Sequence, residues 1–406
     1  MKAVFQYAWR NLWRNKRRTG ITLTAVVLTT AILVVSFALM DGMIVHLLDA
    51  ATNMVVGEAK VHAEGYREDR SFFKSIDNPE AILNKAGEQG IEAAPRSYGY
   101  GLVSVGTKSS GAIFWGIDPE AERKAFDLYK HIQYGKFLTE SPTKGIVLGH
   151  KLARSLRVSV GTEIIVVIQA GDGSLGNDLF QVTGILKAAG DDIDRGAAIL
   201  HRKDFEELFV SGGRVHEIAL NSRGKLTVEE LVQVMAPMAP GLKMSTWREL
   251  LPILSDMMNL FGAAVGIFGA IFFLAAGLGV MNTMLMATYD RMREFGILKA
   301  IGTTPWRIMG NMAVEALLLG LVATALGLAI GLPVAYILQE VGIDTSVFGG
   351  EFSFSGVAWD PIWRATISAR VIVIPLVLMW VTCSVASLYP AAVAARIDPV
   401  KAIHYV

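Results

Sequence analysis

The sequence has little that would support catalysis or covalent cross-linking. Its 406 residues include one cysteine, Cys383, so no disulfide can form within the chain. It has no G-x-x-x-x-G-K-[ST] loop, whose backbone N–H groups would hold ATP phosphates, and no G-x-S-x-G segment for a nucleophilic serine. Its seven histidines lack metal-ligand spacing. We therefore expect this chain to have no catalytic residue, no metal ion and no cofactor of its own.

The chain also has almost no net charge. Its 38 Lys and Arg residues nearly balance its 37 Asp and Glu residues, and basic residues are not interleaved with aromatics outside the segments that flank the apolar runs, so nucleic acid is not an expected partner. The composition is 52% apolar, and the mean hydropathy is +0.42. Such a chain is too apolar for a soluble enzyme and too polar to lie wholly in a membrane. We expect part of it to be embedded.

The apolar residues gather in four runs, each long enough to cross about 30 Å of hydrocarbon. Residues 1–20 precede the first run; they are basic, have no acidic residue, and place Phe5, Trp9, Leu12 and Trp13 on one helical face, which predicts a cytoplasmic interfacial helix. A cleaved signal peptide is the alternative, but the run is long and lacks a small-residue cleavage site. The predicted transmembrane helices are residues 21–41, 260–288, 314–338 and 371–388.

Residues 42–259, between the first two runs, have the composition of a water-soluble fold. Helices are expected over residues 78–88, 151–157, 203–209 and 228–235. Alternating patterns predict strands over residues 59–62, 102–105, 112–115, 163–168, 180–185, 197–200 and 217–220. This predicts an α+β domain inserted between the first and second of four transmembrane helices. The basic N-terminus keeps the start of the first span in the cytoplasm, so the domain is extracytoplasmic.

The other connections follow from this topology. Residues 289–313 form a cytoplasmic loop, residues 339–370 an extracytoplasmic loop and residues 389–406 a cytoplasmic tail. Gly262-xxx-Gly266 and Gly327-xxx-Gly331 predict close helix contacts, although glycine is also generally common in membrane helices.

The stretch 289–306, YDRMREFGILKAIGTTPW, predicts an amphipathic helix held between two transmembrane helices. Phe295, Ile297, Leu298 and Ile301 share one face, and Gly302 followed by Pro305 ends the helix. Such a helix is suited to being moved by a soluble partner. The alternative is an ordinary cytoplasmic loop that is basic because of the positive-inside rule.

Residues 281–331, from MNTMLMATYDRMREFGILKAIG onward, resemble the signature of the FtsX-like ABC transporter permeases, which include the MacB and LolC/LolE types. Residues 389–405, YPAAVAARIDPVKAIHY, resemble the C-terminal signature of the same family. The resemblance implies a non-catalytic subunit of the bacterial inner membrane that pairs with a second permease subunit, identical or homologous. A separate ABC ATPase dimer would bind ATP and Mg and drive it by mechanotransmission. The implied ATPase-coupling residues are Arg291, Arg293, Glu294, Gly296, Lys299, Gly302 and Trp306.

GEAKVHAEGY at residues 57–66 and GIDPEAE at residues 116–122 look like the lipoprotein-releasing LolC/LolE branch. The implied cargo is a lipoprotein drawn from the outer leaflet and passed to a periplasmic chaperone. However, residues 168–180 are a short glycine-rich turn where LolC carries a hook for that chaperone. The alternatives are a MacB-like efflux permease with a periplasmic adaptor and an FtsX-like subunit that controls cell-wall hydrolases. Candidate cavity residues, also open to ordinary packing roles, are Thr22, Thr29, Ser36, Phe261, Phe268 and Phe272.

Overall fold

The computed structural model describes residues 2–187, 189–344, 353–354, 357–358, 362–398, 400 and 402. The chain divides into two compact units. The first comprises Met1–Val45, Met258–Thr345 and Ile362–Val406, and the second comprises His46–Met257 and Ser346–Pro361. Thirteen of the 32 residues of the predicted outer loop, namely 345–352, 355–356 and 359–361, lie outside the described residues.

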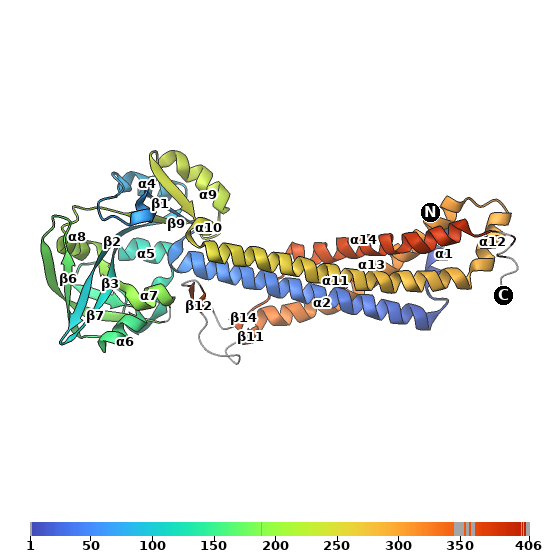
Figure 1. Ribbon diagram of the computed structural model, residues 1–406, viewed down its shortest axis with the longest axis horizontal. Helices are drawn as coiled ribbons and strands as arrows, with labels where there is room; N and C mark the ends of the chain where they lie inside the picture. Colours follow the sequence, from blue (N-terminus) through green and yellow to red (C-terminus); the bar gives the residue numbers. More distant parts are fainter. Residues whose placement is uncertain are drawn as a thin grey trace. The chain divides into compact units, whose positions relative to one another are not determined.

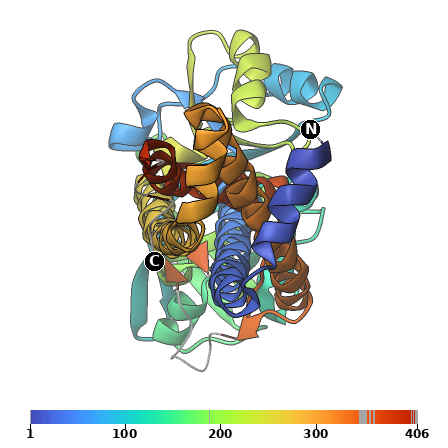
Figure 2. The same cartoon turned by 90° about the vertical axis from the view of Figure 1, so that its right-hand side faces the viewer.

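The first unit is a bundle of long helices (Figures 1 and 2). Four helices among the described residues are long and apolar enough to span a membrane, which confirms the predicted count. Each extends beyond the apolar run that predicted it, because polar turns continue the same helix. The elements of this unit are α1 Lys2–Leu12, α2 Lys16–Ala51, α11 Pro252–Asp290, α12 Met292–Ala300, α13 Pro305–Glu340 and α14 Ala369–Arg396, with a short strand pair, β11 Ile343–Asp344 and β14 Ile362–Trp363.

One predicted glycine pair marks close packing, and the other does not. A Cβ added to Gly327 would lie 2.6 Å from Cβ of Thr30, and one added to Gly331 would lie 3.1 Å from the carbonyl oxygen of Ala31, so α13 packs tightly on α2. This part of the prediction is confirmed. Around Gly262 and Gly266 of α11, no atom of the described chain lies within 4 Å of an added Cβ. There the missing side chains leave open space.

The residues predicted to share one interfacial face at the N-terminus differ in their exposure. Leu12 is buried in the core of the bundle, whereas Trp9 and Trp13 are 43% and 40% exposed and pack edge to face. The side chain of Phe5 lies outside the described residues. The exposed tryptophans fit the level of lipid headgroups.

The second unit is an α+β fold around a ten-stranded sheet of order β10-β1-β9-β2-β3-β8-β5-β7-β4, with β6 paired to β2 and β7. Its strands are β1 Ala59–Ala63, β2 Glu92–Val105, β3 Lys108–Ile117, β4 Ile132–Gly135, β5 Gly145–Leu148, β6 Glu163–Gln169, β7 Leu175–Leu186, β8 Ala197–His201, β9 Glu217–Asn221 and β10 Leu242–Thr246. Its α-helices are α3 Tyr66–Asp69, α4 Pro79–Glu88, α5 Pro119–Ala125, α6 His150–Leu156, α7 Asp191–Gly196, α8 Arg202–Phe209, α9 Val228–Met235 and α10 Trp247–Leu250. Shorter elements are the π-helix Thr52–Val56, two 3₁₀ segments, Leu128–His131 and Ala236–Met238, and the strand pair β12 Ser353–Phe354 and β13 Val357–Ala358.

Glycines let the phenylalanines of α8 press directly on the sheet. A Cβ on Gly99 of β2 would lie 2.2 Å from Phe209, and one on Gly116 of β3 would lie 2.5 Å from Phe205. Both phenylalanines are fully buried, and their rings stack with centroids 4.3 Å apart. The core on this face therefore requires glycine in the strands, and successive side chains on β2 alternate between this core and the other face of the sheet.

All seven predicted strands and all four predicted helices of this unit are present. The glycine-rich connection is a plain hairpin turn, as expected: β6 and β7 pair up to Gln169 and Leu175, and the N–H of Ala170 donates to the carbonyl of Ser174 at 2.8 Å. Sequence patterns missed β4, β5, β10, α3, α5, α7 and α10. Of these, α5 has a recognisable start. Asp118 is the N-cap, its carboxylate accepts from the N–H of Glu120, and the next residue, Pro119, is the first of the helix.

Candidate coupling loop and membrane groove

The stretch 289–306 folds as a short helix between two long ones. Helix α11 ends at Asp290, α12 runs over Met292–Ala300, and Gly302 follows with a φ of +94°. That backbone conformation favours glycine. Pro305 has a different role from the predicted one: it does not end α12, because it is the first residue of α13, directly after the N-cap Thr304.

One side of α12 is held by ion pairs to the rest of the first unit. The guanidinium of Arg291 lies 3.0 Å from a carboxylate oxygen of Glu315 on α13 and 3.3 Å from one of Glu294. Arg291 and Glu315 are 5% and 6% exposed, so this pair is buried. Glu294 also accepts from Arg14, which precedes α2, at 2.6 Å. These contacts fix α12 against α2 and α13.

A second anchor ties α12 to the end of α14. The ammonium of Lys299 donates to the carbonyl oxygens of Ala395 and Ile397 at 2.9 and 2.6 Å. A cation at the last carbonyls of a helix satisfies acceptors that have no intrahelical partner and interacts favourably with the helix dipole. Phe295 and Gly296 lie on the buried side of α12. Lys299 and Gly296 therefore face the bundle.

The opposite side of the loop is exposed. Arg293 and Gly302 are exposed, and Trp306 is 78% exposed. Ile297 and Ile301, predicted to share a face with the buried Phe295, are instead 48% and 74% exposed. Of the seven predicted coupling residues, Arg291, Glu294, Gly296 and Lys299 thus contact the bundle, whereas Arg293, Gly302 and Trp306 face outward. Ile297 and Ile301, which were not among the seven, add two apolar side chains to the outward surface. An exposed surface with large apolar side chains and a cation is suited to contact with a partner protein.

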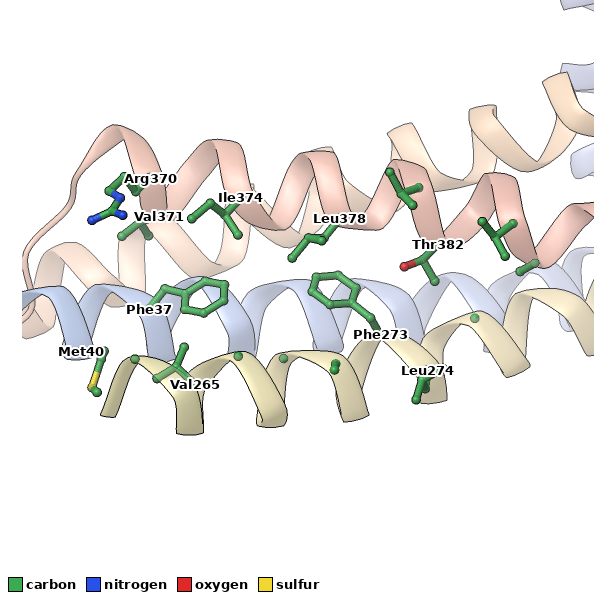
Figure 3. A pocket seen from close by; sticks show the side chains of 18 of the residues that line it. Phe37, Met40, Val265, Phe273, Leu274, Arg370, Val371, Ile374, Leu378 and Thr382 are labelled. Atoms are coloured by element: carbon green, nitrogen blue, oxygen red, sulfur yellow. The ribbon is translucent and has the colours of Figure 1, made fainter. Parts of the chain in front are cut away.

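A cavity of about 800 Å³ lies between α2, α11 and α14 of the first unit, and we refer to it as the groove. Figure 3 shows Phe37 and Met40 of α2, Val265, Phe273 and Leu274 of α11, and Ile374 and Leu378 of α14 around it. The lining is mostly apolar. It is open along α11 partly because Gly262, Gly266, Gly269 and Gly277 line it without side chains.

One end of the groove is polar. Arg370, at the start of α14, and Asp41 of α2 both line the cavity. The carboxylate of Asp41 accepts from the hydroxyl of Ser368 at 2.6 Å, while Arg370 is exposed. The groove therefore combines a long apolar wall with a charged end, which suits an amphipathic molecule.

None of the six residues predicted for a cargo cavity lines this groove. Thr22 is buried, and its hydroxyl hydrogen-bonds that of Thr283 on α11. Phe272 packs against the core of the bundle, whereas Ser36 and Phe268 are exposed, and Thr29 and Phe261 are half-buried. The prediction named residues of α2 and α11 on other faces than those that line the groove, and it did not include α14, which supplies the third wall. A row of glycines on α11 was the signal that marked the groove.

Within the described part of the chain, no cluster of three or more His, Cys, Asp or Glu side chains is placed to hold a metal ion. The polar groups of the loop and the groove are instead engaged with one another or exposed. The arrangement provides surfaces and contacts for binding.

Two sequence families match the chain. Residues 19–237 match the family described as MacB-like periplasmic core domain, and residues 266–399 match the family described as FtsX-like permease C-terminal. The first match alone covers more than half of the chain.

The chain is also similar to individual transport proteins. The lipoprotein-releasing system transmembrane protein LolC of Xylella fastidiosa is 24% identical over 97% of this chain and 96% of its own length. The pyoverdine export ATP-binding/permease protein PvdT of Pseudomonas fluorescens is 24% identical over 98% of this chain but only 59% of its own length. The macrolide export ATP-binding/permease protein MacB of Wolinella succinogenes is 23% identical over 98% of this chain and 60% of its own length.

Proposed function

Since this chain belongs to the FtsX-like ABC transporter permeases that carry a MacB-like periplasmic core domain, we propose that it is a membrane subunit driven by a separate ATPase. The ATPase dimer binds ATP and Mg, and a second permease subunit, identical or homologous, completes the complex. The chain lies in the bacterial inner membrane, with both termini in the cytoplasm and the second unit in the periplasm. The basic N-terminus supports this orientation through the positive-inside rule.

The coupling loop is the proposed ATPase contact. Trp306, Ile301 and Arg293 are exposed and form the docking surface, while Arg291, Glu294 and Lys299 transmit its displacement to the helices they bind. This surface is largely apolar and carries the cation of Arg293. It inserts into a cleft of the ATPase, where Trp306 is the aromatic anchor that supplies most of the binding free energy.

The proposed cargo is a lipoprotein extracted from the outer leaflet and released to a periplasmic carrier. The observation that carries this proposal is the groove, because its apolar wall fits acyl chains and its charged end fits the polar part of the same molecule. Similarity to LolC over nearly the whole chain supports the same cargo.

The test fills the groove without changing the rest of α11. Gly266→Leu places a side chain into the groove, whereas Gly279→Leu, also exposed and with open space around its Cβ, does not line it. The complex with its ATPase is reconstituted in proteoliposomes with a triacylated lipoprotein, and release to a soluble carrier is measured together with bound acyl chains by mass spectrometry.

We expect Gly266→Leu to lower both bound acyl chains and release at least fivefold, while the basal ATPase rate and the Gly279→Leu control stay unchanged. A wild-type complex that carries no acyl chains without ATP, or equal loss in both variants, would contradict lipoprotein extraction by this groove.

MacB-like efflux is the second candidate. The short β6–β7 hairpin supports it, since the turn from Ala170 to Ser174 offers no arm for holding a carrier protein. Similarity to PvdT and MacB supports it as well. Native copurification separates the two candidates: a periplasmic adaptor together with ATP-dependent export of a small molecule or peptide would favour efflux, and a lipoprotein carrier would favour extraction.

A further inference from the structure

The second unit contains a cavity of its own, of about 500 Å³, which falls in the range of cavities that hold small organic ligands. It lies on the face of the sheet opposite the phenylalanines of α8. Its apolar walls come from the π-helix after α2, from β3, α7 and α10, and they include Met54, Ile113, Ile193, Leu250 and Leu251.

Two neighbouring strands supply an aromatic wall. Tyr98 and Tyr100 of β2 are two residues apart and face the cavity, whereas Gly99 between them faces Phe209 on the other side. Tyr98 lies directly opposite Trp115 of β3, and the two rings pack edge to face with centroids 5.6 Å apart. The alternation of tyrosine with glycine thus builds a packed core on one face and the cavity wall on the other.

This wall has hydrogen-bond donors without acceptors. Tyr98 is only 6% exposed, yet its hydroxyl has no hydrogen-bond partner among the residues that the structure describes. Within the same residues, the indole N–H of Trp115 also has none. Trp115 is half-buried, and neither donor is closed off from the cavity, because within the described chain the buried side-chain donor without a partner is on Asn11. A ligand with acceptor atoms would supply a partner.

The charges around the cavity favour an anion. Four lining residues are cationic (Lys60, Arg67, Arg70 and Arg195) and two are anionic (Asp192 and Glu217). Glu217 is already neutralised, since it lies 2.9 Å from the ammonium of Lys60 with only 2% of its side chain exposed. Burial alone would raise the pKa of Glu217, but Lys60 and the nearby arginines outweigh it and lower the pKa to about 2. This carboxylate therefore stays charged and paired.

Two of the arginines that line the cavity, Arg67 and Arg70, are differently engaged. Arg67 donates to the carbonyl of Glu249 at 3.0 Å and, more weakly, to Ser245 at 3.5 Å. The side chain of Arg70 is exposed and makes no hydrogen bond or ion pair among the described residues, although its charge helps to lower the pKa of Glu217. A guanidinium presents several donors in a plane and can bind two oxygens of a phosphate or carboxylate at once.

We propose that this cavity binds an amphiphile with a single apolar chain and a phosphate or carboxylate head group. The head group accepts from Arg70, Tyr98 and Trp115, and the apolar chain of the ligand lies against Ile113, Met54, Leu250 and Leu251. This site is separate from the groove in the first unit, and the proposal does not depend on the proposed function, because binding is measured without ATPase or cargo.

The full chain in lipid nanodiscs is labelled with a photoreactive analogue of decyl phosphate, and the labelled peptides are identified by mass spectrometry. Decyl phosphate, decanol and inorganic phosphate are used as competitors. We expect the label on β2 or β3. We also expect decyl phosphate to displace it at a concentration at least tenfold below that needed with decanol or inorganic phosphate. Equal displacement by inorganic phosphate would replace the amphiphile with a free anion, and equal displacement by decanol would remove the role of charge; either would overturn the proposal.

Variants test the assigned contacts. Arg70→Gln is expected to weaken displacement by decyl phosphate about tenfold or more, and Tyr98→Phe about threefold, since each removes donors to the head group. Arg154→Gln, at an exposed arginine of α6 that does not line the cavity, is expected to have no effect. Because the side chain of Arg70 is exposed and makes no hydrogen bond or ion pair in the described chain, its loss should leave the fold intact. Wild-type affinity in Arg70→Gln, or labelling confined to the transmembrane helices, would refute the site.

Discussion

The buried ion pair beneath the coupling loop allows a quantitative test. Arg291→Gln removes the guanidinium that lies 3.0 Å from Glu315, a side chain only 8% exposed. Removing one partner of a buried pair typically costs about 3–5 kcal/mol. A carboxyl can avoid part of this penalty by binding a proton, which costs about 3.7 kcal/mol at pH 7 for a reference pKa near 4.3. We therefore expect the free energy of unfolding to fall by about 3–4 kcal/mol at pH 7.

The same reasoning fixes the pH dependence of the variant. In Arg291→Gln the folded state holds Glu315 protonated while the unfolded state releases that proton, so lower pH favours the folded variant. At pH 5.5 the protonation cost is only about 1.6 kcal/mol, and the loss should shrink accordingly. Each loss is measured against wild type at the same pH.

The measurement is reversible unfolding in mixed micelles of SDS and a non-ionic detergent, followed by tryptophan fluorescence at both pH values. The double variant Arg291→Gln, Glu315→Gln should recover at least half of the loss, since no unpaired charge remains. Arg293→Gln, an exposed neighbour, should change stability by less than about 0.5 kcal/mol. A loss in Arg291→Gln below about 1 kcal/mol, or one that does not depend on pH, would refute the reasoning.

Three further predictions concern the loop, the domain and the bundle. Two variants test the coupling role: Gly302→Val, at a φ of +94°, and Glu294→Lys, which reverses a charge held by two arginines. Both should leave membrane insertion intact but lower transport per ATP hydrolysed severalfold in proteoliposomes. An unchanged ratio of transport to ATP hydrolysis in both variants would exclude the coupling role. Glu217→Gln should lower the free energy of unfolding by about 3 kcal/mol at pH 7, because folding lowers the pKa of this carboxyl from 4.5 to about 2. The difference from wild type should vanish as the pH drops through that interval, as measured by thermal unfolding followed by circular dichroism. Gly327→Leu, where an added Cβ lies 2.6 Å from α2, should cost about 1–3 kcal/mol in the mixed-micelle unfolding assay, whereas Gly262→Leu enters open space and should cost less than about 0.5 kcal/mol.

Much of the fold could be predicted because its signals are local. Apolar runs predict membrane helices from length alone, and alternating patterns predicted strands such as β6 and β9. Strand β2 was harder: it begins at Glu92, but Pro95 and Gly99 made its first half resemble a loop. The reason lies in tertiary packing, because Phe209 occupies the space where a side chain of residue 99 would lie.

The candidate sites were predicted less completely, because they depend on which side of each helix faces the bundle. Periodicity grouped Ile301 with Phe295, yet the first is exposed and the second buried. The family resemblance implied Lys299 as a coupling residue, but its position relative to the end of α14 is set by the fold. The groove needs α14 as its third wall, and no pattern in the first two spans contains that information.

The contacts of α12 also bear on how force enters the membrane. Through Arg14, Arg291 and Lys299, this nine-residue helix is bonded to the α1–α2 connection, to α13 and to the last turn of α14, and it follows α11 directly in the chain. A displacement imposed on it would be shared among all four spans from the first moment. If the proposed coupling role holds, a partner acting on α12 would tilt the whole bundle rather than push along one helix.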